Sequence, residues 1–377
     1  MQTDALVEGM NALDYLVANV SPVDLGHGLD AFEAWRERAD FELISANLVW
    51  QDSGDAIVAP TAIRKVDLRV GAKKRSVRLG FIGLTSNDPA FMLEGPEGRR
   101  IVTIDPFSAA AKHLPALRKK SDAVIALVNF TLNESRALPK KVEGLDLILG
   151  GHGREQTRTD DFPEDTKFGR TRIMYIGHQG QNLGELRLRF DDQGRIVASE
   201  RHAHQLTRAW PEDPVLAELV ERTKVAVNEH HRELAVASNP FAQSEPETTG
   251  AFTGSERCGS CHEEAYAIWK KSRHARAFDI LVEQNQNFNP RCVGCHTIGF
   301  GKPAGFVNVR STPGLVHVGC ESCHGPSRDH PDVIEAGFGR TTVTGCVNCH
   351  TKDNSPEYDP ATYIPLIKHW ADGTADR

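Results

Sequence analysis

Apolar residues recur in short runs over the first half of the chain. Residues 41–49 read FELISANLV, and the runs at 77–84, 123–129 and 145–149 read VRLGFIGL, AVIALVN and LDLIL. Continuous apolar runs of this length are typical of strands covered on both faces of a sheet. We predict a helix over 108–120 between two of these strands, and later strands at 172–177, 183–190 and 196–203. Strands alternating with helices indicate an α/β domain over residues 1–205.

Two further stretches have a helical period. Residues 1–15 form an amphipathic pattern, and Asp213-Pro214 opens an apolar helical stretch that ends near Ala235. Asp at the N-cap followed by Pro at the first helical position is a strong helix start. We therefore expect a connecting helix within residues 206–237. Residues 238–256 are polar, contain two prolines and show no period, which indicates a linker.

Composition narrows the class of protein. The 377 residues are 40% hydrophobic and 25% charged, with a formal net charge of −7, which argues against a nucleic-acid partner. No run of 18 apolar residues occurs, so we expect no membrane span. The start has no basic segment followed by an apolar core, so no signal peptide is visible.

All eight cysteines lie in four Cys-x-x-Cys-His motifs after residue 257. Two thiols at this spacing can bond both vinyl groups of a haem, and the next His then ligates the iron. Paired cysteines also occur in zinc ribbons and in disulfides, but neither needs a His after every pair. The motifs predict four covalent c-type haems in residues 257–377, with these attachment residues and proximal ligands: Cys258, Cys261 and His262; Cys292, Cys295 and His296; Cys320, Cys323 and His324; Cys346, Cys349 and His350.

Four other histidines in this segment, His274, His317, His330 and His369, are candidates for the second axial position. The equal number does not establish pairing, and each could instead be a surface histidine. His274 follows WKKSR on a predicted helix, His330 lies in a predicted turn, and His317 precedes the third motif. An iron without a second His would be open to a small ligand.

Residues 250–370 resemble the tetrahaem cytochrome c-554 family. The resemblance rests on TGSERCGSCH with WKKSRH after it, on CVGCHT, on GCESCHGP followed by His330, and on CVNCHTKDNSP. It implies a mainly α, loop-rich domain of closely stacked haems, mostly His/His ligated, that passes single electrons between redox partners. It also implies that the haem of His296 is five-coordinate. Glu321, within the third motif, is typical of the family, although a lone glutamate could equally be a surface charge.

Residues 1–205 resemble the calcineurin-like phosphoesterases of the 5′-nucleotidase branch. The matching segments are MNAL at 10–13, GLD at 28–30, ADFELISANL at 39–48, VRLGFIGLT at 77–85 and LDLILGGH at 145–152. That family holds two metal ions through Asp, His and Asn. Here Asn19 has no His after it, VNF stands where Ser-His is expected, and only His152 of Gly-His-Thr-His remains. The resemblance therefore implies an incomplete metallophosphoesterase domain that is catalytically degenerate.

These features predict a multihaem cytochrome that transfers electrons between partner proteins, either alone or within a larger multihaem assembly. The alternatives are an enzyme acting on a small nitrogen or sulfur compound at an open haem, and a working nucleotidase with a haem appendage. Covalent haem attachment takes place outside the cytoplasm, so we expect a periplasmic or extracellular protein. We interpret the missing signal peptide as a start assigned too far downstream, or as a fragment.

Overall fold

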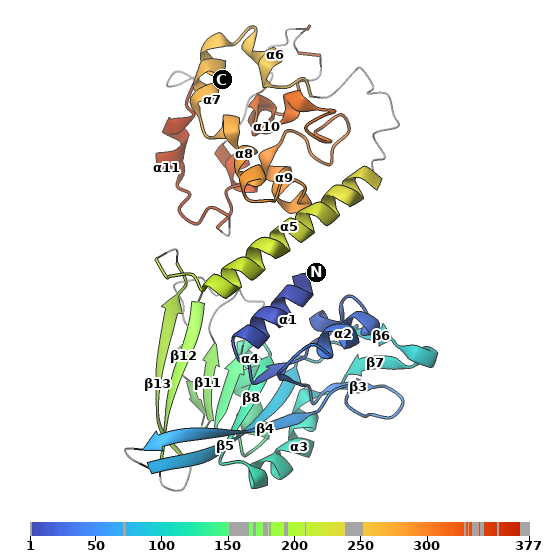
Figure 1. Ribbon diagram of the computed structural model, residues 1–377, viewed down its shortest axis with the longest axis vertical. Helices are drawn as coiled ribbons and strands as arrows, with labels where there is room; N and C mark the ends of the chain where they lie inside the picture. The colour runs from blue at the N-terminus through green and yellow to red at the C-terminus, as the bar shows by residue number, and fades with distance from the viewer. Residues whose placement is uncertain are drawn as a thin grey trace. The chain divides into compact units, whose positions relative to one another are not determined.

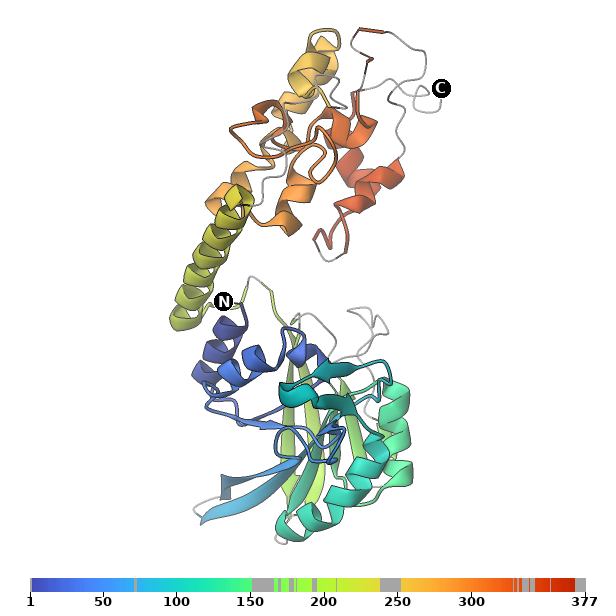
Figure 2. The same ribbon diagram turned by 90° about the vertical axis from the view of Figure 1, so that its right-hand side faces the viewer.

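The computed structural model describes residues 2–70, 73–150, 166–168, 171–175, 180, 182–191, 195–207, 209–237, 252–327, 329–330, 332–333, 339, 343–352 and 354–369. The chain divides into two compact units, Thr3–Ala217 and a second made mainly of Glu218–Arg377. The division falls inside the predicted connecting helix. Figures 1 and 2 show the elements of both units.

A six-stranded sheet with the order β10-β11-β9-β8-β5-β4 forms the centre of the first unit. Its four inner strands are parallel, and an antiparallel strand closes each edge. The predicted α/β architecture is confirmed. The strands are β4 (Thr61–Val70), β5 (Lys73–Thr85), β8 (Ala123–Asn129), β9 (Leu147–Gly150), β10 (Thr166–Phe168) and β11 (Thr171–Tyr175).

Both faces of this sheet are covered, as the apolar runs predicted. On β8, Val124 and Ala126 belong to a buried cluster with residues of helices α3 (Pro106–Lys120) and α4 (Leu132–Lys141). The next side chain along, Ile125, packs on the opposite face with Ile44. Figure 2 shows the two helices along one side of the sheet.

Smaller elements surround the central sheet. Strands β1 and β2 pair in parallel, while β3-β7-β6 and β12-β13 are antiparallel. The predicted helix at 1–15 and the strands at 183–190 and 196–203 are confirmed. The bounds are α1 (Gln2–Ala12), β1 (Val17–Asn19), η1 (Pro22–Leu25), α2 (Leu29–Arg36), β2 (Glu42–Ile44), β3 (Leu48–Trp50), β6 (Met92–Glu94), η2 (Pro96–Gly98), β7 (Arg100–Thr103), β12 (Asn182–Phe190) and β13 (Ile196–Gln205).

The prediction of one strand over residues 41–49 is wrong. The chain leaves the β1-β2 pair after Ile44 and joins β7 only at Leu48. Asn47 between them is fully buried. Its side chain accepts a hydrogen bond from Thr85 N–H at 2.9 Å and donates to Thr85 O at 2.7 Å and Ile104 O at 3.1 Å. An inward-facing amide that bonds three backbone groups divides the apolar run into two short strands.

The second unit consists of short helices joined by loops, as predicted. Its apolar core is small: the buried cluster is Phe278, Leu281, Val293, Ile298, Phe306 and Leu315. The elements are the longer part of α5 (Pro214–Ala237), then α6 (Ser255–Gly259), α7 (Glu263–Lys271), η3 (His274–Arg276), α8 (Asp279–Glu283), α9 (Pro290–His296), η4 (Pro313–Leu315), α10 (Cys320–His324), η5 (Val343–Asn348), α11 (Pro360–Tyr363) and η6 (Ile364–Leu366).

Helix α5 begins where the sequence predicted. The Asp213 carboxylate accepts hydrogen bonds from the N–H groups of Val215 and Leu216 at 2.9 and 3.1 Å, which caps the helix. Most of the predicted linker lies outside the described residues, and its last two residues form the start of α6. Within the described part of the chain, no helix is both long and apolar enough to cross a bilayer.

Candidate haem-binding site

Each haem motif lies on a short helical turn. The first begins at the end of α6, the second ends α9, the third forms α10 and the fourth begins within η5. In the first and fourth, the His N–H donates to the carbonyl of the first Cys at 2.9 Å, as His262 does to Cys258. A helical turn places positions i, i+3 and i+4 on one side, so both thiols and the His of a motif face the same space.

None of the eight cysteines forms a disulfide, and thiols of different motifs lie close together. A hydrogen bond with Cys258 lowers the pKa of Cys320 to about 7, so these residues of the first and third motifs are in contact. Burial, with Cys295 nearby, raises the pKa of Cys349 to about 12, which joins the second and fourth motifs. Cysteines of the first and third motifs, and of the second and fourth motifs, therefore lie close together.

Three motif histidines each have a non-motif histidine opposite. The ring centroids are 6.5 Å apart for His262 and His330, 6.1 Å for His350 and His274, and 5.8 Å for His324 and His369. An iron ion bonded at about 2.0 Å to one nitrogen of each of two opposed imidazoles places their centroids about 6 Å apart. The three separations therefore fit an axially ligated iron.

Hydrogen bonds orient the proximal rings. The Nδ1 atoms of His296 and His324 are bonded to the carbonyls of Ala277 and Gly339, and Nδ1 of His350 lies 3.1 Å from the Ser355 hydroxyl. When Nδ1 is engaged in this way, Nε2 is left to bind a metal. These residues fit a haem iron on geometry as well as on residue type.

One detail of the distal histidines differs from the sequence prediction. The predicted helix through His274 is wrong at its end, because α7 stops at Lys271 and His274 opens the separate turn η3. Burial lowers the pKa of His274, which keeps its ring neutral and able to bind a metal. His330 lies in a turn, as predicted.

The second motif differs from the others. Within the described residues, no histidine ring faces His296. The remaining candidate, His317, instead accepts a hydrogen bond through Nδ1 from Phe278 N–H at 3.1 Å. The structure thus groups six histidines in three pairs and leaves His296 and His317 outside them.

Glu321 is buried and holds two loops together. Its carboxylate accepts hydrogen bonds from the backbone N–H groups of Thr253 at 3.0 Å, Gly254 at 2.8 Å and Ser327 at 2.9 Å. Only 5% of its surface is exposed. Glu321 therefore ties the segment before the first motif to the loop after the third, and it is not a surface charge.

Sequence reasoning missed several neighbours of the histidines. The Tyr358 ring lies 4.8 Å from the His350 ring at an interplanar angle of 15°, and Tyr363 meets the same ring edge-on at 5.6 Å. Burial raises the pKa of Tyr358 to about 12. The sequence pattern did not identify these tyrosines, because their distance from the His350 ring depends on how the chain folds and not on a motif.

The first unit retains little of a two-metal centre in its described residues. Asn19, at the end of β1, donates to Leu84 O at 2.9 Å. Near the end of β8, Ser86 Oγ donates to Glu134 at 2.8 Å, and Glu134 also accepts from Thr131 N–H. No three His, Cys, Asp or Glu side chains are grouped to hold a metal ion in the part described. His152 lies outside the described residues.

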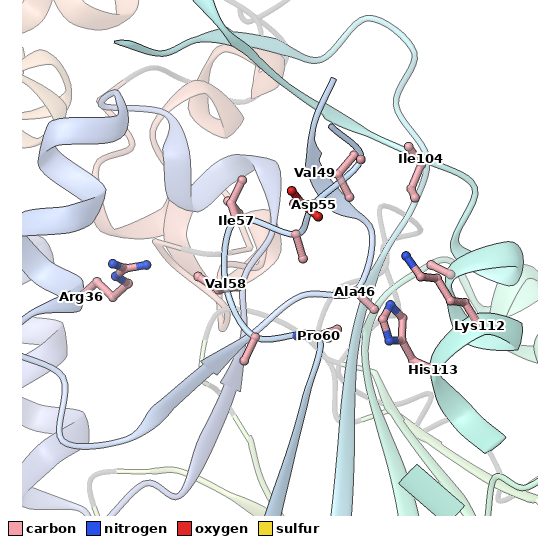
Figure 3. A pocket seen from close by; sticks show the side chains of 14 residues that line it. Arg36, Ala46, Val49, Asp55, Ile57, Val58, Pro60, Ile104, Lys112 and His113 are labelled. Carbon is pink, nitrogen blue, oxygen red and sulfur yellow. The ribbon is translucent and has the colours of Figure 1, made fainter. Parts of the chain in front are cut away.

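A cavity of about 570 Å³ lies elsewhere in the first unit, between the loop at 54–60 and helix α3. Its walls are mostly apolar. Figure 3 shows Lys112 and His113 on one side and Arg36 on the other, with Asp55 between them. Burial, and to a lesser extent Lys112, lowers the pKa of His113. None of the lining residues belongs to the predicted metal or haem sites.

The motifs and opposed histidines of the second unit resemble those of multihaem cytochromes, and the first unit is an α/β domain. Residues 257–325 match the family model described as "Cytochrome c554 and c-prime". Over 93 residues the chain is 38% identical to cytochrome c-554 of Nitrosomonas europaea, a match that covers 21% of this chain and 40% of that protein.

The first unit has its own relatives. The chain is 22% identical over 236 residues to human 5′-nucleotidase, covering 59% of this chain and 40% of the human protein. The calcineurin-like phosphoesterase YfkN of Bacillus subtilis superposes with a TM-score of 0.51 at 20% identity, covering 60% of this chain and 75% of that one. The predicted phosphoesterase fold is confirmed. The chain spans about 40% of the length of both curated relatives.

Proposed function

We propose that the protein is a four-haem c-type cytochrome that passes single electrons between redox partner proteins. When bound, each haem stores and transfers one electron at a potential set by its ligands and surroundings. The observation that carries the proposal is the set of three opposed histidine pairs, His262 with His330, His350 with His274 and His324 with His369. Two nitrogen ligands hold an iron in one geometry in both oxidation states, which suits electron transfer.

The close approach of thiols from different motifs supports rapid transfer within the module. Covalent haem attachment takes place outside the cytoplasm, which supports a periplasmic or extracellular location for the mature protein. The first unit then serves as a scaffold or a docking surface, and a larger multihaem assembly is one setting for such a relay.

The proposal is tested on the full chain produced with a cytochrome c maturation system. We expect an intact mass with four haems, and electron paramagnetic resonance (EPR) spectra with three low-spin His/His signals and one high-spin signal. His330→Ala and His369→Ala should each convert one low-spin haem to high spin. His27→Ala, at an exposed residue of the first unit, is the control and should change nothing. Fewer than four haems, or spectra unchanged by both distal variants, would contradict the assignment.

A second candidate function rests on His296, which has no opposed ring among the described residues. An open sixth position there would bind a small nitrogen or sulfur compound. Adding nitrite, hydroxylamine or sulfite to the protein, with an excess of a chemical reductant to supply electrons, should then perturb one haem out of four and produce steady consumption of the added compound and of the reductant. A spectrum with only six-coordinate low-spin iron would refute it.

The nucleotidase alternative is addressed by a separate assay. The chain should release no phosphate from AMP with added manganese or zinc, because Asn19 and His152 are too few ligands for two hard cations. Steady, metal-dependent phosphate release would show that the first unit is an enzyme.

A further inference from the structure

One peptide group joins the two histidines that remain outside the pairs. The Ala277 carbonyl is hydrogen-bonded to Nδ1 of His296, and the N–H of the same peptide, that of Phe278, donates to Nδ1 of His317 at 3.1 Å. His296 is thus linked to His317 through a single amide. The two residues are 21 positions apart in sequence.

The direction of each bond follows from the atoms. The carbonyl can only accept, so His296 donates from Nδ1–H and keeps Nε2 for the metal. The Phe278 N–H can only donate, so Nδ1 of His317 is unprotonated. Burial lowers the pKa of His317, and a neutral ring is the form that this bond requires. An amide that donates on one side accepts more strongly on the other, because hydrogen bonds in a chain polarise one another.

The backbone of His317 is held in an unfavourable conformation. Its φ is +73°, a left-handed value that costs a side chain with a Cβ atom free energy. Hydrogen bonds on both sides of His317 fix this conformation. Before it, Leu315 O accepts from Ile298 N–H at 2.9 Å. After it, Val318 N–H donates to His274 O at 3.2 Å, and Val318 O accepts from Trp269 Nε1 at 2.8 Å. Such strain persists where the surrounding structure requires a particular side chain in a particular place.

We propose that His317 is a positioning residue for the haem of the second motif, acting on His296 through the Ala277–Phe278 peptide and not as an axial ligand. This inference rests on the proposed function, since it needs a haem at His296. A stronger bond from Nδ1–H gives the His296 ring more anionic character. The ring then donates more charge to the iron and favours its oxidised state.

Two substitutions separate the hydrogen bond from the backbone strain. His317→Gly removes the acceptor and also removes the cost of positive φ, so the variant should fold. His317→Asn keeps an acceptor oxygen near the place of Nδ1 and tolerates the left-handed region. In the full haem-loaded chain, the Gly variant should raise the reduction potential of the high-spin haem. It should also lower the iron–histidine stretching frequency in the resonance Raman spectrum, and the Asn variant should restore both towards the original values.

Each outcome decides the matter. Unchanged potential and stretching frequency in His317→Gly would overturn the positioning role. Conversion of a low-spin haem to high spin would also overturn it, because His317 would then be an axial ligand. The proposed function fails by a different observation, an intact mass with fewer than four haems in the original chain. A preserved haem count with no shift in the variant therefore refutes only the role of His317.

Discussion

Glu321 offers the sharpest test of how the haem module is held together. Its carboxylate lies between the chain segments before the first motif and after the third, and three backbone N–H groups donate to it. The substitution Glu321→Gln preserves the shape of the side chain. It replaces one accepting oxygen with an NH₂ group that can only donate.

The expected cost follows from which bonds survive. Ser327 N–H bonds one carboxylate oxygen and Gly254 N–H bonds the other, at 2.9 and 2.8 Å, so a single amide oxygen keeps only one of them. A hydrogen bond to a charged group contributes about 1.5–3 kcal/mol, and a buried donor left without a partner costs about 1–3 kcal/mol. We therefore expect Glu321→Gln to reduce the free energy of unfolding of the module by about 3 kcal/mol.

The assay is urea unfolding of the haem-loaded chain, followed by the Soret band. This band reports on the haem-bearing unit alone, which matters because the chain has two units and need not unfold in one step. Glu283→Gln, at an exposed position on α8, is the matched control and should stay within about 0.5 kcal/mol. If Glu321→Gln also stayed within that range, the hydrogen bonds of the Glu321 carboxylate would contribute nothing to stability, and the reasoning from them would be refuted.

Three further predictions concern other packing features. Tyr175→Phe should destabilise the first unit by about 1–2 kcal/mol in thermal unfolding followed by circular dichroism, because the tyrosine hydroxyl lies 2.7 Å from the fully buried hydroxyl of Ser135; no change would contradict this. Asp105→Ala should remove an N-cap worth about 1 kcal/mol. The Ser108 hydroxyl bond lowers the pKa of Asp105 below its ordinary value, so the advantage of the original chain should be present at pH 7 and should be lost as the pH falls through the lowered pKa; a difference independent of pH would argue against it. Gly319→Ala should reduce the yield of haem-loaded protein, since its Cβ would lie 2.3 Å from a serine hydroxyl and 2.4 Å from an isoleucine methyl; a normal yield would refute that clash.

Much of the fold could be predicted from the sequence because its strands are buried on both faces. The run AVIALVN corresponds to β8 residue for residue, since its alternate side chains enter two separate clusters. The same reasoning failed at residues 41–49. There the buried Asn47 bonds backbone groups of Thr85 and Ile104, which are 38 and 57 positions away. A local apolar pattern carries no information about such distant partners.

The candidate haem site also has parts that local sequence predicts and parts that depend on residues distant in the chain. The proposed attachment cysteines and proximal histidines follow from local spacing, so the Cys-x-x-Cys-His motif names these candidates directly. The distal residues come from elsewhere in the chain. His330 precedes the fourth motif yet lies opposite His262 of the first, and His369 lies opposite His324. The sequence supplies the candidate distal histidines, but only the three-dimensional fold shows which of them lies opposite which motif histidine.

His317 shows why counting candidates was insufficient. Four non-motif histidines would be enough for four motifs, but the equal number did not establish pairing. The hydrogen bond from Phe278 engages Nδ1 of His317, and among the described residues no ring contact joins His317 to His296. A ring used only as a fourth distal ligand would need neither that bond nor a backbone at φ +73°. Both features are explained together if His317 supports the proximal side of the second motif. The unequal division of the histidines, three opposed pairs and one relayed pair, distinguishes the second motif from the other three.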